Sequence, residues 1–292
     1  MTLAQLRYLV AIVDARLNMT LAAERLHATQ SALSKQIKVL EESLGLQLFV
    51  RRGRSLESLS VAGEAVADRA RKILVEADNI RALAANHRHE ATGELVIAAT
   101  QTQARFFLPP ALQRLKAAYP GVKVRLNLFG DPQGARLARQ GADLTIASAI
   151  GRPDTGDVAI PLYRWDRVAV VPQAHPLARS GQPVSLARLA RFPLIGYETA
   201  LGSQAEVAAA FARAGSPAQF AYTAHDAEVI KTYVRASLGV GLLGEMALTA
   251  EDEDLTRLRV EGLPTCTAYA LLGSDRVERD YVVSFVTSSP RN

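Results

Sequence analysis

Residues 20–54 read TLAAERLHATQSALSKQIKVLEESLGLQLFVRRGR, and this stretch decides how the first part of the chain folds. Apolar residues recur at helical spacing over residues 21–27 and again over residues 31–44. Between them, residues 28–30 leave room for only a three-residue turn. The spacing therefore predicts two helices joined by a short turn, which is the helix-turn-helix arrangement.

The residues before this stretch, and the ends of the two helices, fit the same pattern. An apolar period over residues 3–16 predicts a preceding helix. Asn18 or Thr20 can cap the next helix, Ser31 can cap the one after it, and Gly45 is a typical helix stop. We therefore expect a small three-helix unit.

The helix predicted over residues 31–44 has two different faces. Its apolar stripe consists of Leu33, Ile37, Leu40 and Leu44. Polar residues at positions i, i+3, i+4 and i+7 form another face, and these are Ser31, Ser34, Lys35 and Lys38. Short hydroxyls and lysines on such a face can reach base edges and phosphates from a major groove of DNA. The alternative is an ordinary solvated helix face.

A basic turn follows this helix. Residues 46–50 and 55–59 are short extended runs on either side of a glycine turn, which predicts a β-hairpin. Arg51, Arg52 and Arg54 would lie at its tip, where they could contact backbone phosphates as the wing of a winged helix does. Helix-turn-helix and basic hairpin together favour a winged DNA-binding domain over residues 1–60, with the helix-turn-helix at about 19–38.

Residues 61–90 form the next segment, and residues 61–88 carry one long helical pattern. Its apolar residues are spaced 4, 3, 4, 3 and 4 apart, as in a heptad seam: Val66, Ala70, Ile73, Ala77, Ile80 and Ala84. A helix of this length spans about 42 Å at 1.5 Å per residue, and its stripe needs a partner. We expect a linker helix that pairs with a second copy of the chain, mainly through Val66, Ile73, Ala77 and Ile80. Packing on its own domain is the alternative.

Composition limits the remaining possibilities. The chain has 292 residues, 49% of them hydrophobic and 22% charged, which is typical of a globular protein of about two domains. Its single cysteine, Cys266, rules out an intrachain disulfide and leaves a cysteine-based zinc site without ligands. One cysteine suits a reducing cytosol, although a cysteine-poor secreted protein would look the same. The N-terminal residues do not resemble a signal peptide, and no stretch is long and apolar enough to span a membrane. We therefore expect a cytoplasmic protein without membrane association.

The charge is unevenly distributed. The net charge is +5, and residues 1–60 hold eight Lys or Arg against five Asp or Glu, which makes them the most basic part per residue. A basic segment supports binding to nucleic acid, although solubility explains it equally well.

Strands and helices alternate after a break at residues 91–93. Alternation of this kind predicts mostly parallel sheets with helices on both faces. We expect an α/β domain over residues 92–292 with two lobes, which resembles a small-ligand binding module of the periplasmic-binding-protein type. Lobe I would be about 92–162 with 267–292, and lobe II about 163–266. The expected strands are 95–99, 122–128, 144–147, 168–171, 194–197, 220–223 and 268–272, and the expected helices are 107–119, 132–140, 185–191, 203–214 and 226–237.

Polar residues gather where the first of these strands ends. Thr100, Thr102 and Gln103 follow strand 95–99, and Ser148 ends a neighbouring strand. Open α/β sheets bind ligands at the carboxyl ends of their strands, and backbone N–H groups with neutral hydroxyls suit a small anion. The alternative is a polar helix cap without a ligand.

Several other patterns carry little weight. Residues 239–244 match GxGxxG, but they follow a helix and not a strand, which argues against a dinucleotide site. His87 and His89 lack a third metal ligand, so we predict no metal site. The sequence contains no GxSxG, HExxH or P-loop motif, so we predict no cofactor and no enzymatic activity. Two rival classes remain, a solute-binding protein for small anions and an enzyme that uses the cleft. The first would leave residues 1–60 without a role.

Residues 3–64 resemble the winged helix-turn-helix of LysR-type transcriptional regulators, from LRYLVAIVDARLNMTLAAERLHATQSALSKQIKVLEESLGLQLFVRRGR to Ala62-Gly63. One departure is Ser31, where that family usually has proline. The resemblance extends along the chain, since such regulators have a winged head, a linker helix and a two-lobed effector domain. It implies promoter DNA as a partner and a homodimer or homotetramer.

A finer resemblance is to the CysB-like branch of these regulators. It is carried by Leu17-Asn18, by TQTQAR at 100–105, by YRWDR at 163–167 and by HDAEVIKTYVR at 225–235. Members of that branch control sulfur assimilation or sulfonate use in response to sulfate, acetylserine or adenylylsulfate. The resemblance thus implies a small sulfur-linked anion as effector.

The same resemblance adds further residues to the expected site. It implies Trp165 in the cleft, and it places the position of another threonine of the branch at Gly202, with Ser203 beside it. Glycine lacks the hydroxyl, which puts that contact in doubt.

Overall fold

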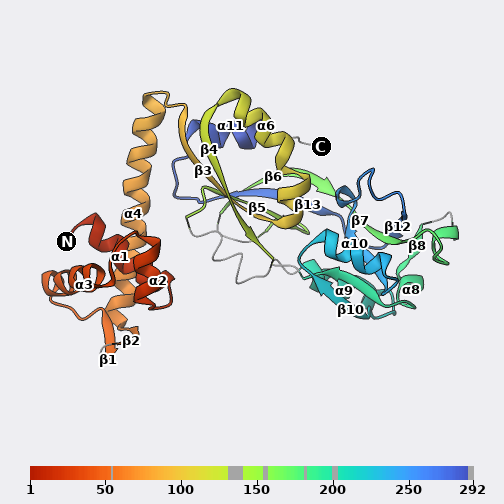
Figure 1. Cartoon of the computed structure of the whole chain (residues 1–292), viewed down its shortest axis with the longest axis horizontal. Helices are drawn as coiled ribbons and strands as arrows, with labels where there is room; N and C mark the ends of the chain where they lie inside the picture. Colours follow the sequence, from red (N-terminus) through yellow and green to blue (C-terminus); the bar gives the residue numbers. More distant parts are fainter. Residues whose placement is uncertain (54, 131–140, 154–156, 181–182, 199–202, 289–292) are drawn as a thin grey trace. The chain divides into compact units, whose positions relative to one another are not determined.

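The computed structural model describes residues 1–53, 55–130, 141–153, 157–180, 183–198 and 203–288 (Figure 1). They divide into two compact units, residues 1–87 with 275–277 and the rest of the chain from Arg88 onward. The elements of the first unit are α1 (Leu3–Asp14), α2 (Met19–Arg25), α3 (Gln30–Leu44), β1 (Phe49–Arg52), β2 (Ser55–Leu59) and α4 (Val61–His87).

Capping residues determine where the first helices begin. The Thr2 side chain accepts a hydrogen bond from the Gln5 backbone N–H, and the Asn18 side chain accepts one from Leu21 N at 3.0 Å. The expectation that Ser31 caps α3 is wrong. Thr29 is the cap, because its Oγ1 accepts from Ala32 N at 3.2 Å, and Ser31 lies within the first turn. Gly45 ends the helix with a φ of +66°, in the left-handed region that favours glycine.

One core holds the first unit together. Its buried residues come from α1, α2, α3, the hairpin and the start of α4: Leu6, Leu9, Ile12, Ala15, Ala22, Ala23, Leu33, Ile37, Leu40, Leu48, Phe49, Ala67 and Ala70. Gly63 allows α4 to approach the hairpin, since a Cβ at this position would lie 1.9 Å from the carbonyl oxygen of Leu48. Near the other end of α4, Asn79 donates to the Asp275 carbonyl and accepts from Val277 N, both at 2.8 Å.

Lobe I is built on a five-stranded sheet in the order β4-β3-β5-β13-β6. β3 is parallel to β4 and β5, whereas β13 is antiparallel to β5 and β6, so the sheet is mixed and not mostly parallel. The elements of this lobe are β3 (Thr92–Thr100), α5 (Gln101–Phe106), α6 (Leu108–Ala118), β4 (Gly121–Phe129), β5 (Leu144–Ala149), β6 (Val158–Trp165), β13 (Cys266–Leu272) and α11 (Asp280–Ser288).

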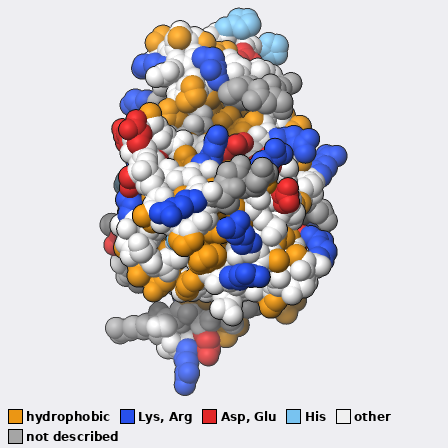
Figure 2. All heavy atoms as spheres, turned by 90° about the vertical axis from the view of Figure 1, so that its right-hand side faces the viewer, with side chains coloured by type: hydrophobic (Ala, Val, Ile, Leu, Met, Phe, Trp, Pro, Cys, Tyr) orange, Lys and Arg blue, Asp and Glu red, His pale blue; other side chains and the backbone are white. Residues whose placement is uncertain are grey.

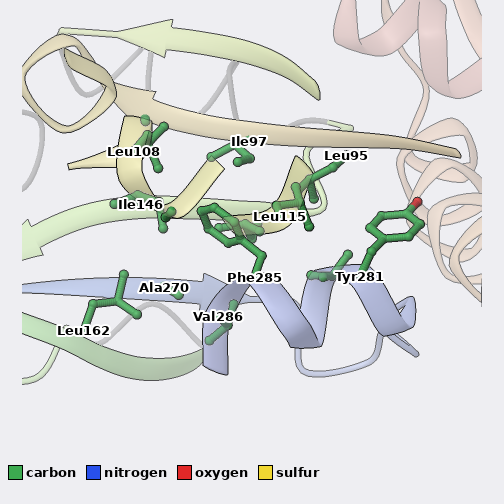
Figure 3. Packing of buried hydrophobic residues seen from close by; sticks show 14 of the residues in the cluster. Leu95, Ile97, Leu108, Leu115, Ile146, Leu162, Ala270, Tyr281, Phe285 and Val286 are labelled. Carbon is green, nitrogen blue, oxygen red and sulfur yellow. The ribbon is translucent and has the colours of Figure 1, made fainter. Parts of the chain in front are cut away.

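Helices α6 and α11 cover the core of lobe I. Figure 3 shows Phe285 of α11 pointing toward Leu115 of α6 and Ile146 of β5, and all three are buried. Chain segments more than 130 residues apart in sequence therefore meet in this core, and the C-terminal helix returns to the first lobe as expected.

Lobe II has a six-stranded sheet in the order β10-β9-β11-β7-β12-β8. Helix α10 packs on one face of it, and α8 and α9 pack on the other. The elements are β7 (Arg167–Pro172), η1 (Ala178–Ser180), β8 (Val184–Ser185), α8 (Leu186–Leu189), β9 (Leu194–Tyr197), α9 (Ser203–Arg213), β10 (Phe220–Ala224), α10 (Ala227–Arg235), β11 (Val240–Gly244), η2 (Glu245–Ala247) and β12 (Leu255–Glu261).

The structure corrects several expectations for this domain. The helix expected over 107–119 is α6, at Leu108–Ala118, and a short helix that was not expected, α5, precedes it at Gln101–Phe106. Strand β6 pairs with β13, so lobe I runs through Trp165 and not only to residue 162. Strands β6 and β12 were not expected, and residues 240–244, within the GxGxxG match, form the buried strand β11. The helix expected at 132–140 lies outside the described residues.

The charged side chains of the effector domain are dispersed. Figure 2 shows Lys and Arg side chains scattered over the visible face, with acidic and hydrophobic side chains between them. Within the described segments, no helix is long and apolar enough to cross a membrane.

Candidate DNA interface and effector cleft

Helix α3 presents the expected polar face. Ser31, Ser34, Lys35 and Lys38 are all exposed, while Leu33, Ile37 and Leu40 on the opposite side are buried in the core. The helix is also anchored by a side-chain contact, because Gln5 Nε2 of α1 donates to Gln36 Oε1 of α3 at 3.2 Å. The polar face is thus held on a rigid support and is open to solvent.

The hairpin is positioned by a glutamate that sequence reasoning missed. The Glu41 carboxylate is only 5% exposed, and it accepts hydrogen bonds from Leu48 N at 2.8 Å and Phe49 N at 3.3 Å. It also pairs with Arg51 Nη2 at 3.3 Å, so Arg51 is partly engaged inside the head. Arg52 is exposed, and Arg54 lies outside the described residues.

The apolar stripe of α4 is packed against the head at its start and exposed farther along. Val66 and Ala70 pack against the core of the head, which agrees with the alternative that this helix packs on its own domain. Farther along, Ile73 is 40% exposed, Ile80 is 67% exposed and Ala77 is half-buried. The outward part of the stripe therefore begins at Ile73.

The residues expected in the effector cleft lie at the start of α5. Thr100 caps this helix, since its Oγ1 accepts from Gln103 N at 3.4 Å. Thr102 Oγ1 donates to the Tyr197 hydroxyl at 3.4 Å, and Tyr197 ends β9 in the other lobe. Burial raises the pKa of Tyr197 to about 12, so its phenol stays protonated at neutral pH. Thr102, one of the predicted site residues, thus makes a hydrogen bond from lobe I to lobe II.

Gln103 and Ser148 form the centre of a buried polar network. Gln103 is 3% exposed, and its Oε1 accepts from the Tyr163 hydroxyl at 2.5 Å. Its Nε2 donates to Ser148 Oγ at 2.9 Å, and Trp165 Nε1 donates to the same oxygen at 3.1 Å. Burial raises the pKa of Tyr163, so this phenol remains a donor. The structure therefore brings Gln103, Ser148 and Trp165 together, as expected, and adds Tyr163.

This network determines what Ser148 can still do. A hydroxyl has two acceptor lone pairs and one donor hydrogen. Both lone pairs are occupied by Gln103 and Trp165, and no described residue accepts the Ser148 hydrogen. The half-buried hydroxyl can consequently act only as a donor, which suits an anion or another acceptor.

A buried arginine lies behind the indole of Trp165. The Arg167 guanidinium is 5.2 Å from the Trp165 ring centroid, and its Nη1 donates to Cys266 Sγ at 2.9 Å. Arg167 is 6% exposed. Two other expected site residues are not placed, since Gly202 lies outside the described residues and the side chain of Ser203, at the start of α9, is not described.

The segment at 225–235 has a structural role in α10. Asp226 caps the helix by accepting from Glu228 N at 2.8 Å. Lys231 is 2% exposed and donates to Asp252 Oδ2 at 2.8 Å, and Arg235 Nη2 reaches Asp252 Oδ1 at 2.9 Å. In this chain the segment thus takes part in a buried ion network.

A charged hollow of about 670 Å³ lies beside the two crossovers between the lobes. It is lined by Asp166 and Arg167 at one crossover, by Thr265 at the other, and by Arg257 and Arg259 of β12. Glu245 and Glu261 also line it, so the hollow carries both signs of charge. In the part of the chain that the structure describes, no group of His, Cys, Asp and Glu side chains is arranged to hold a metal ion.

Comparisons with known proteins agree with this architecture. Residues 3–64 match the bacterial regulatory helix-turn-helix protein of the lysR family, and residues 88–288 match the LysR substrate binding domain. The HTH-type transcriptional regulator CysB of Haemophilus influenzae is 37% identical over 98% of this chain and 89% of that protein. The HTH-type transcriptional regulator cbl of Klebsiella aerogenes is 38% identical over 92% and 86%.

Solved structures show the same fold. The cofactor-binding domain of the Cbl transcriptional regulator is 35% identical, covers 68% of this chain and 88% of that one, and has a TM-score of 0.61. A full-length single-residue variant of OxyR from Pseudomonas aeruginosa is 21% identical, with 99% and 97% coverage and a TM-score of 0.74. Because the relatives are transcriptional regulators, the chain is a regulator and not an enzyme. With a winged head, a linker helix and a two-lobed effector domain that all match, the chain belongs to the LysR family of transcriptional regulators.

Proposed function

We propose that this LysR-family regulator is CysB-like and controls genes of sulfur assimilation in response to a small sulfur-linked anion. The likeness to CysB and cbl over most of the chain supports the pathway. Helix α3 and the hairpin bind promoter DNA, with Ser31, Ser34, Lys35 and Lys38 toward the groove and Arg52 on a phosphate. The exposure of these side chains supports their role. The cytoplasm is the compartment that this role requires.

The outward apolar stripe of α4 supports assembly of a homodimer, or of a homotetramer made from two such dimers. Ile73 and Ile80 are large apolar side chains left in water by a single chain, and a second copy of α4 offers the same spacing. Ala77 lies between them and allows close approach.

The observation that carries the effector proposal is the hydroxyl of Ser148. Its two lone pairs are occupied, so it offers only a donor. Thr102 becomes a second donor when its hydroxyl hydrogen, which points to the Tyr197 hydroxyl at 3.4 Å, turns toward the ligand. Neutral donors that are held in place by a network bind an oxyanion without a full counter-charge. Sulfate, a sulfonate, acetylserine and adenylylsulfate all present such oxygens.

Calorimetry of the full chain with these four ligand types tests the site. Ser148→Ala removes the donor and should weaken binding about ten- to a hundredfold, the range for one hydrogen bond to a charged acceptor. Ser148→Thr keeps the hydroxyl and should bind like the wild type. Arg257→Ala is the control for the charged hollow.

The outcomes separate three cases. Loss only in Ser148→Ala supports the cleft, and loss only in Arg257→Ala places the anion in the hollow and refutes the cleft. If the wild type binds none of the four ligand types, the sulfur-linked effector is wrong, while membership of the LysR family is unaffected.

A further inference from the structure

Helix α5 contacts both lobes of the effector domain. Its first turn carries Thr102 and Gln103, which belong to the proposed effector site. Its last two residues face lobe II. Arg105 Nη2 lies 3.4 Å from Glu228 Oε1 of α10, and Phe106 packs against the buried cluster of lobe II that includes Ile230. The helix that presents the effector-binding groups is therefore also docked on the opposite lobe.

Glu228 is held in place for this contact by its own lobe. Its Oε1 lies 2.7 Å from Lys231 Nζ, one turn farther along α10. Lys231 is in turn fixed by Asp252 at 2.8 Å and by the Ala247 carbonyl at 3.1 Å. The Phe106 ring lies 5.9 Å from the same ammonium group. One carboxylate thus serves two cations, a buried one from lobe II and a half-exposed one from lobe I.

We propose that Arg105 and Phe106 are positioning residues for the effector, and that with Glu228 they form a latch between the lobes. This inference rests on the proposed effector cleft. The latch keeps α5 against lobe II and so holds Thr102 opposite Tyr197, the arrangement in which both lobes can contact one ligand. Neither latch residue of α5 needs to touch the effector.

The affinity for the effector then depends on how many molecules have α5 held against lobe II, which we call the closed arrangement. When only one arrangement binds, the apparent Kd is the intrinsic Kd divided by the fraction of molecules in that arrangement. Removing a half-exposed ion pair shifts such an equilibrium modestly, so Arg105→Gln should raise the Kd about two- to fivefold. The change should be larger at low ionic strength, because salt screens the pair.

The matched control is Arg125→Gln. Arg125 pairs with Glu94 at 3.3 Å and its side chain is 56% exposed, against 54% for Arg105, but both partners of this pair lie in lobe I. Each substitution therefore removes one exposed arginine ion pair, but only Arg105→Gln breaks a contact between the lobes.

The experiment is a double-mutant cycle on the full chain with Arg105→Gln and Glu228→Gln. Two quantities are measured, the Kd for inorganic sulfate from the fluorescence of Trp165 and the distance between spin labels on the two lobes without ligand. The proposal expects a raised Kd and a broader distance distribution in Arg105→Gln, little further change in the double variant and no change in Arg125→Gln.

Two results would overturn the latch. In the first, Arg105→Gln matches the control in both measurements. In the second, the effects of the two substitutions simply add, which means that the two side chains are not coupled. If the wild type does not bind sulfate, the proposed effector fails for that ion, and the label distances alone decide on the latch.

Discussion

The buried carboxylate of Asp252 gives the most quantitative prediction, which concerns the stability of lobe II. Asp252 is 6% exposed and accepts hydrogen bonds from Lys231, from Arg235 and from the backbone N–H of Thr249. Asp252→Asn keeps the shape but removes the charge opposite Lys231. The buried cation is then left with one charged partner, the half-exposed Glu228 at 2.7 Å, and with the Ala247 carbonyl at 3.1 Å.

Two independent arguments give the size of the effect. Burial works to raise the pKa of Asp252, but hydrogen bonds from Lys231, Thr249 and Arg235 outweigh it and lower the pKa from 3.8 to about 2. Such a difference corresponds to about 2 kcal/mol of stability at neutral pH. Breaking a buried ion pair typically costs about 3–5 kcal/mol, and the remaining contact with Glu228 favours the low end of that range. We expect a loss of about 2–3 kcal/mol.

Urea titration of the full chain, followed by tryptophan fluorescence, measures this loss. Trp165 is the only tryptophan, so the signal reports on the effector domain without a contribution from the head. The control is Asp254→Asn, because Asp254 also pairs with Arg235, at 2.7 Å, but has a 54% exposed side chain. Its unfolding midpoint should stay close to that of the wild type.

The pH dependence provides a second check. The folded pKa of Asp252 lies below the unfolded value, so its contribution is complete above pH 3.8 and is lost as the pH falls toward about 2. The difference between wild type and Asp252→Asn should therefore be constant from pH 7 to about pH 5. A midpoint equal to that of the wild type, or a difference that already disappears within this range, would refute the reasoning.

Three further predictions concern the head, the linker and the cleft. Lys35→Ala should weaken operator binding and Arg52→Ala should reduce its dependence on salt concentration, because each removes a cation that contacts DNA. Fluorescence anisotropy over a salt series measures both effects. Unchanged affinity and an unchanged salt slope would contradict the assignment of these residues to the DNA interface. Ile80→Asp should dissociate the oligomer, since it places a charge in an apolar contact. Val61→Asp, at an 88% exposed position, is the control and should not. Light scattering that shows the native mass for both variants would rule out the stripe of α4 as the oligomer contact. Thr102→Ala should lose the effector response in a promoter-binding assay and keep basal DNA binding, and an intact response would exclude Thr102 from the site.

Local sequence signals predicted the head well because its elements are determined by nearby residues. The caps, the three-residue turn and Gly45 all act within a few positions along the chain. The one error, Ser31 in place of Thr29, is a choice between two hydroxyls two residues apart. Glu41 could not be found in this way, because its carboxylate becomes significant only when the hairpin folds back onto α3.

The cleft shows the same division. Gln103, Ser148 and Trp165 meet as predicted. Tyr197, the partner of Thr102, comes from β9 of the other lobe and has no sequence signal of its own, and Tyr163, which donates to Gln103, has only the resemblance at residues 163–167 as a signal.

The missed strands have physical explanations too. Strand β6 contains Pro161, which sequence patterns discourage in strands but which an edge position such as that of β6 tolerates. Strand β12 alternates buried Leu258 and Val260 with exposed Arg257 and Arg259. This period of two is a sequence signal from which the strand could have been predicted.

The position of Cys266 has a practical consequence for labelling chemistry. It is the only cysteine in the chain, its exposed fraction is 0%, and burial raises the pKa of its thiol. Maleimides react with accessible thiolates, so the native protein should stay unmodified while folded. Any cysteine introduced on the surface then becomes the single reactive position without prior removal of a native one. Dyes and spin labels can therefore be attached to either lobe in an otherwise wild-type background, with the Arg167–Cys266 contact left intact.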